Sequence, residues 1–149
     1  MRAIRSFFFL VLSFLVFTGC KKDSNNQPAE NSITAKVDGA SWSATSVAGT
    51  LSTDDFTLTG TNNTGTVNLT VSDFAGEGIY SISFSTVAVY SNAATPIESW
   101  PSTGVNGGGR IEVTSLQGRR IAGTFNFASN NGSSTKTITE GVFDVTIPE

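Results

Sequence analysis

The sequence of 149 residues contains no histidine and only one cysteine, Cys20. Histidine is the commonest general base and a frequent metal ligand, so its absence excludes Ser-His-Asp and Cys-His catalysis. A single cysteine cannot form an intrachain disulfide, so a secreted domain of this sequence must be stabilised by its apolar core. We therefore expect a protein that is not an enzyme and that binds no cofactor.

Charged residues are also scarce, at 14% of the chain, and acidic residues outnumber basic ones by twelve to nine. A nucleic-acid-binding protein needs a basic surface that can contact phosphates. Beyond residue 31 the chain has only five basic residues, which are Lys36, Arg110, Arg119, Arg120 and Lys136. We predict no nucleic-acid partner, and we interpret Arg119-Arg120 as a solubilising pair at a turn.

The only long apolar run lies in residues 7–17, and its eleven residues are well below the roughly 20 that a membrane-spanning helix needs. Arg2 and Arg5 precede this run, and the small residues Thr18-Gly19 follow it. A positive start, a short apolar run and a small-residue cleavage site are typical of a secretory signal. The pattern predicts export and no permanent membrane span.

The segment ending at Cys20 resembles the lipobox of bacterial lipoproteins, with Phe17 where leucine is commonest. In that class the cysteine thiol takes a diacylglyceryl group and becomes the acylated first residue of the mature chain. The resemblance implies a cleaved signal over residues 1–19 and an outer-membrane lipid anchor on Cys20, facing the periplasm or the cell surface. Residues 20–31 have no apolar residue larger than alanine after the cysteine, which predicts a flexible tether. The alternative is a cleaved signal that leaves a free thiol.

Residues 32–149 show no helical spacing of apolar residues, but many short alternating runs separated by turn residues. Residues 33–37 alternate, and after Asp38-Gly39 the alternation resumes at Trp42, which predicts a hairpin with Trp42 in the core. Before Gly141 the apolar residue Ile138 lies at an even position, whereas after it Phe143, Val145 and Ile147 lie at odd positions. A glycine where the inward-facing positions shift by one residue predicts a bulge.

Other turns are expected at residues 54–55, 62–65, 117–118 and 130–134, and residues 80, 82 and 84 are expected on one apolar face. The regular turns and the lack of crossover helices predict an all-β fold. We expect an antiparallel β-sandwich of about 8–10 short strands, with a small β-barrel as the alternative.

A Ser-Lys pair with Lys36 or Lys136 as base remains conceivable, but we expect neither lysine to be desolvated enough to lose its proton. Carboxylates are the other candidates for chemistry. Glu98, Glu112, Asp73 and Glu77 could in principle supply a glycosidase pair, but their spacing selects none of them. The acids in turns, at residues 54–55 and at Asp73 with Glu77, could offer oxygen ligands to calcium, yet they are far sparser than those of an EF-hand loop. We interpret them as ordinary turn residues and predict no metal site.

Residues 91–109 form the longest irregular stretch, with two prolines and three consecutive glycines. Long loops on a rigid scaffold often carry function. Trp100 could stack on a sugar ring there, with Tyr90 and Asn106 making polar contacts. The favoured alternative is that Trp100 packs back over an open end of the core.

Several strand-and-turn segments together resemble small Bacteroidota lipoproteins that carry a β-sandwich domain of unknown function. They are Val37-Asp38-Gly39 with Trp42, Gly78 with Tyr80, residues 109–116, residues 123–127 and residues 141–145. The charged Lys21-Lys22-Asp23 after the cysteine is similar to that type as well. The resemblance spans about residues 33–147 and implies fold and anchoring, but no catalytic residues. We expect an anchored envelope lipoprotein whose non-enzymatic domain, residues 32–149, binds an envelope protein or a glycan. The alternative is a carbohydrate-binding accessory module that uses residues 91–109.

Overall fold

The computed structural model describes residues 30–94 and 96–149, and this part of the chain contains eleven strands and no helix. The expected signal, the lipidation site Cys20 and most of the expected tether lie outside these residues. No helix of the described ranges could cross a membrane. The strands are β1 (Ser32–Val37), β2 (Ala40–Ser43), β3 (Ser46–Leu51), β4 (Asp55–Thr61), β5 (Gly65–Ser72), β6 (Gly78–Ser81), β7 (Thr86–Asn92), β8 (Ser99–Ser102), β9 (Gly107–Gln117), β10 (Arg120–Asn130) and β11 (Thr135–Thr146).

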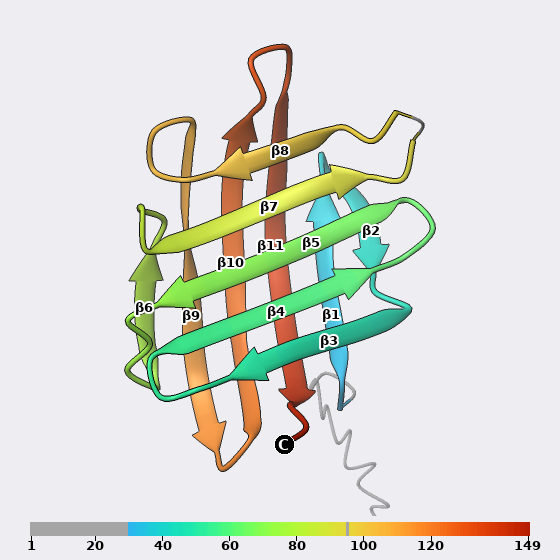
Figure 1. Cartoon of the computed structure of the whole chain (residues 1–149). Helices are drawn as coiled ribbons and strands as arrows, with labels where there is room; N and C mark the ends of the chain where they lie inside the picture. The colour runs from blue at the N-terminus through green and yellow to red at the C-terminus, as the bar shows by residue number, and fades with distance from the viewer. Residues whose placement is uncertain (1–29, 95) are drawn as a thin grey trace, which may run out of the picture.

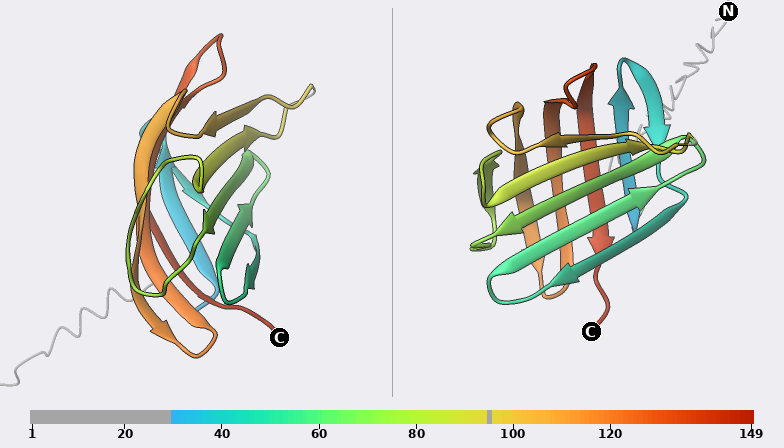
Figure 2. Two further views of the ribbon diagram at one scale, coloured as in Figure 1. Left: turned by 60° about the vertical axis from the view of Figure 1, so that its left-hand side comes forward. Right: turned by 45° about the horizontal axis from the view of Figure 1, so that its top comes forward.

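The strands form two antiparallel sheets that pack face to face, with their strands crossing steeply (Figures 1 and 2). One sheet has six strands in the order β2-β1-β11-β10-β9-β6, and the other has five in the order β3-β4-β5-β7-β8. The predicted antiparallel sandwich is confirmed, with eleven strands and no closed barrel. The first strand β1 pairs with the last strand β11, near the middle of the six-stranded sheet.

The core lies between the sheets, where alternate residues of each strand point inward. Val67, Leu69 and Val71 of β5 are fully buried from one side, and Phe125 and Phe143 are buried from the other. Phe56 joins the two layers, because its ring centroid lies 5.9 Å from that of Phe143. Burial of each such side chain contributes roughly 1.5–3 kcal/mol to stability. In the described residues, this core therefore stabilises the fold.

The hairpin predicted at Asp38-Gly39 is confirmed. β1 and β2 pair antiparallel through Val37 and Ala40, so the turn has two residues. Asp38 and Gly39 both have positive φ, at 49° and 83°, as the favoured tight hairpin turn requires. Trp42 is buried, as predicted.

The bulge predicted at Gly141 is confirmed as well. Phe125 of β10 pairs with Gly141, but Phe127 pairs with Ile138, so β11 carries one extra residue. Glu140 adopts φ 51° within this bulge. A Cβ at position 141 would lie 2.6 Å from the Phe125 ring, which explains why the position requires glycine.

Two expectations are wrong in part. The apolar face over residues 80–84 ends early, because β6 stops at Ser81 and β7 begins in the other sheet, so Phe84 lies on the connecting turn and is exposed. The irregular stretch of residues 91–109 contains β8 and the start of β9. Proline and glycine in these strands concealed the pairing, since Pro101 lies on an edge strand, where proline is tolerated.

Candidate functional site

The structure brings together Tyr90 and Trp100, the two residues predicted for ligand binding. They are directly opposite each other on β7 and β8, and their ring centroids are 5.9 Å apart. Both side chains point into the sandwich, and Tyr90 and Trp100 are only 6% and 3% exposed. The pair therefore contributes to the core under an edge strand and does not present an open platform.

Trp100 is covered by the β10–β11 hairpin and by an ion pair. Its indole N–H donates a hydrogen bond to Ser134 Oγ at 3.0 Å. Lys136 Nζ lies 5.4 Å from the centroid of the Trp100 ring, and the same ammonium group donates to Asp38 Oδ2 at 2.6 Å. A sugar ring would have to displace Lys136 to stack on Trp100, so the geometry favours the packing alternative.

The pKa values at this end of the sandwich favour a fixed ion pair. Hydrogen bonds from Lys136 and from the Thr137 backbone N–H hold the pKa of Asp38 below its ordinary value. The hydrogen bond to Asp38 raises the pKa of Lys136, and burial raises the pKa of Tyr90. Lys136 is thus charged at neutral pH and unsuited to act as a general base.

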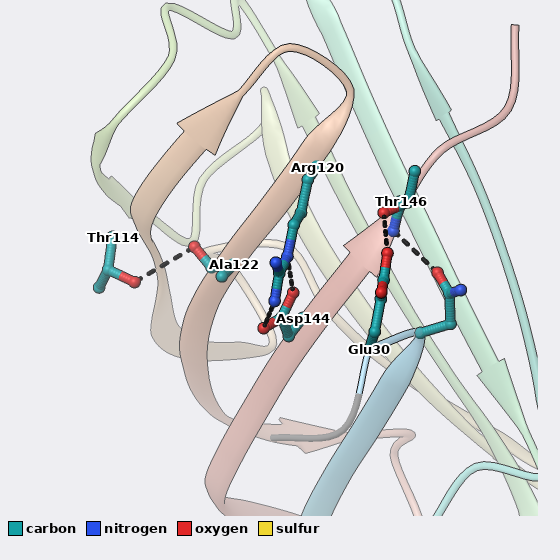
Figure 3. A network of polar contacts seen from close by, with 7 residues as sticks. Glu30, Thr114, Arg120, Ala122, Asp144 and Thr146 are labelled. Carbon is teal, nitrogen blue, oxygen red and sulfur yellow. Dashed lines mark hydrogen bonds and ion pairs between the residues drawn. The ribbon is translucent and has the colours of Figure 1, made fainter. Parts of the chain in front are cut away.

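A second polar cluster lies on the outer face of the six-stranded sheet, between β10 and β11. Arg120 donates from Nε and Nη2 to the two carboxylate oxygens of Asp144, each at 2.8 Å (Figure 3). Asp144 is 1% exposed, and its hydrogen bonds raise the pKa of Arg120. Arg119 donates from its guanidinium to the carbonyl groups of Ile147 and Pro148.

The interpretation of Arg119-Arg120 as a solubilising pair is therefore wrong, because both side chains tie the end of β11 to the β9–β10 turn. Asp144 was missed because the pair forms only in the observed register of β10 and β11. The available signal was one acidic residue inside an otherwise apolar run, Val142-Phe143-Asp144-Val145.

Glu30 and Asn31 lie beside this cluster. Thr146 donates from its backbone N–H to Asn31 Oδ1 at 2.8 Å and from its hydroxyl to Glu30 Oε1 at 2.9 Å (Figure 3). These bonds fix the start of β1 to the end of β11. The start of β1 therefore lies at the end of the sandwich where the C-terminus lies (Figure 1).

An exposed apolar pair, not anticipated from the sequence, lies at the opposite edge of the six-stranded sheet. Phe84 is 85% exposed on a turn closed by a hydrogen bond from Ser83 N to Thr86 O at 2.9 Å. Val105 is 76% exposed in the β8–β9 connection. We call Phe84 and Val105 the apolar corner.

The two turns of the apolar corner touch each other. A Cβ built on Gly104 would lie 3.1 Å from Ser83 Cα, so the backbones are in contact, and both connections lie on the same side of the molecule (Figure 1). Ile79 of β6, which leads into this region, is also exposed. The sequence signal for the turn was the pair of serines that flank Phe84.

Three of the four carboxylates considered for catalysis make separate contacts. Glu77 accepts a hydrogen bond from the Leu116 backbone N–H at 3.0 Å, Glu98 accepts from Asn92, and Glu112 lies 4.0 Å from Arg110. Among residues 30–94 and 96–149, no group of three or more acidic, histidine or cysteine side chains could hold a metal ion.

These features define a small, all-β sandwich domain with two polar clusters and one exposed apolar corner. The chain belongs to a family described as a domain of unknown function (DUF6252), which matches residues 29–148. No curated protein and no solved structure matches the chain.

Proposed function

We propose that this protein is an envelope lipoprotein, anchored through a lipid on Cys20, whose β-sandwich is a non-enzymatic binding domain. The apolar run before Cys20 and the polar segment after it support the anchor. The resemblance to small Bacteroidota lipoproteins supports an outer-membrane location facing the periplasm or the cell surface. The remaining question is which surface binds a partner.

The apolar corner is the observation that carries the binding function. Burying a phenylalanine side chain contributes roughly 1.5–3 kcal/mol, and aromatic side chains are typical centres of protein interfaces. Phe84 lies on a hydrogen-bonded turn, so little conformational freedom is lost when a partner covers it. Neither turn of the corner, residues 83–86 or 103–106, contains a charged residue. The partner that fits is an envelope protein with an apolar pocket.

The position of the corner agrees with this function. β6 is one edge strand of the six-stranded sheet, whereas β1 lies next to the other edge. Glu30 therefore enters the domain on the side away from Phe84. Residues 20–29 could extend about 33–36 Å, so an anchored domain keeps the corner accessible. The glycan alternative lacks a comparable surface, because Trp100 is covered.

Photo-crosslinking in intact cells tests the binding surface. A photoreactive side chain at position 84 or 105 should crosslink to one discrete envelope protein. The same group at Ser41, an exposed residue at the opposite edge, should not, and Phe84→Ser should abolish the product formed from position 105. Equal crosslinking from positions 84 and 41, or none from 84, would reject the corner as the binding surface.

The anchor is tested separately. Cys20→Ala should leave an unlipidated precursor that incorporates no labelled fatty acid, whereas the unaltered protein is labelled. A Cys20→Ala protein that remains fully processed and membrane-bound contradicts lipid anchoring without affecting the crosslinking result.

A further inference from the structure

β3 is an edge strand whose own sequence lacks the usual protection against pairing. The two sheets end in four edge strands, and β2, β6 and β8 have only four residues each, with Pro101 in β8. β3 has six residues, Ser46–Leu51, and contains neither a charged residue nor a proline. An edge strand presents unpaired N–H and C=O groups, and natural proteins usually block them with charge, proline or shortness.

A hollow beside β3 provides space for added side chains. It has a volume of about 430 Å³ and lies between β3 and the end of β11. Its lining is largely apolar, with Val47 and Leu58 on one side and Val145 and Ile147 on the other. A strand paired with β3 would extend the five-stranded sheet and direct its alternate side chains toward this space.

The sequence of β3 is complementary to itself in one antiparallel register. Val47, Gly49 and Leu51 are the half-buried, inward-facing positions, and the residues between them are exposed. When two copies pair about Gly49, Val47 lies opposite Leu51 of the second copy, and inward positions meet inward positions. Gly49 lies on the two-fold axis without a side chain, and no like charges face each other.

We propose that β3 pairs with β3 of a second copy, so that the two five-stranded sheets form one continuous sheet in a symmetric dimer. Such an interface is isologous, as in most homodimers. Each copy directs Val47 and Leu51 toward the region of the other copy's hollow. The proposal goes beyond binding at the apolar corner, and the pairing itself does not depend on Cys20.

The start of the chain favours a second copy over an unrelated strand. Asn31 lines the same hollow as Val47. In the paired dimer, Asn31 of each copy therefore lies close to the two-fold axis. A two-fold axis perpendicular to the extended sheet places both six-stranded sheets on one side of it. Both tethers then leave on the same side, which allows two anchors to enter one membrane.

The molar mass of the full mature protein in detergent tests the dimer. Light scattering should give a dimer for the unaltered protein and a monomer for the double variant Ala48→Lys/Thr50→Lys, which places lysines opposite each other across the axis. Ser41→Lys/Ser43→Lys adds the same charge to edge strand β2 and should remain dimeric. A monomeric unaltered protein, or a dimer that survives the β3 lysines, overturns the proposal.

Disulfide crosslinking in cells provides a readout that does not require the lysine variant to fold. Ala48→Cys/Thr50→Cys should give a dimer band after mild oxidation, while Ser41→Cys/Ser43→Cys and the protein without added cysteine should not. A band of a different mass, from another protein paired with β3, would refute self-pairing. The same dimer band in a Cys20→Ser background separates this result from lipid anchoring.

Discussion

Replacing Trp100 with alanine should destabilise the domain strongly. The side chain is 3% exposed, and truncating a buried tryptophan to alanine typically costs about 3–5 kcal/mol. The tilted ring contact with Tyr90, the hydrogen bond to Ser134 and the contact with Lys136 all disappear. Because a domain of this size is stable by only about 5–15 kcal/mol, the variant should lose a large share of its stability.

Urea unfolding of the mature protein, followed by circular dichroism, measures this loss. With a slope of about 2 kcal/mol per molar urea, a loss of about 4 kcal/mol lowers the midpoint by about 2 M. Trp100→Phe should lose less, because it retains an aromatic ring. Ile97→Ala is the matched control, since Ile97 is exposed in the preceding connection and should change stability by less than about 0.5 kcal/mol. A Trp100→Ala protein with unchanged stability that has lost binding to a glycan would refute the core assignment and favour the sugar platform.

Three further outcomes follow from the structure. Gly123→Ala should fold poorly, because its Cβ would lie 2.6 Å from the Phe143 ring and overlap the backbone of β9. Calorimetry should show a sharply lowered melting temperature. A melting temperature equal to that of the unaltered protein contradicts this packing. The lowered pKa of Asp38 means that its carboxylate stabilises the fold at neutral pH and that this contribution is lost as pH falls through that pKa. The melting temperature of Asp38→Asn should therefore be lower than that of the unaltered protein at pH 7, and the difference should shrink as the pH falls below about 4. A difference that stays constant over this pH range argues against the pair with Lys136. Phe84→Ser should leave the urea midpoint unchanged within error because the ring is exposed, and a large fall in the midpoint would place Phe84 in the core instead of at a binding surface.

The local pattern was enough to predict much of the fold. Asp38-Gly39 and the parity change around Gly141 depend on neighbouring residues only, so the hairpin and the bulge could be read from the sequence. Phe84 could not be placed in this way. Alternation continues through residues 80–84, and only the packing of the two sheets determines that the chain leaves one for the other after Ser81.

The candidate sites were less predictable because they depend on contacts between distant strands. Trp100 was recognised as important, and its packing against Ser134 and Lys136 requires the β10–β11 hairpin to lie over β8. The Arg120–Asp144 pair joins residues 24 positions apart. Neither contact follows from composition or spacing. An exposed edge such as β3 becomes visible only when the strand order is known.

The pairing of the first strand with the last has a consequence for when the domain can form. β11 lies between β1 and β10, so β1 has only its short partner β2 until Asp144 and Phe143 are available to pair with Ser32 and Ile33. Contacts between residues so far apart in the chain form slowly, because a long loop must close first. While the chain is still emerging from the ribosome, the six-stranded sheet therefore cannot be completed. In a nascent chain of this topology, the six-stranded sheet stays open until the residues of β11 have been released.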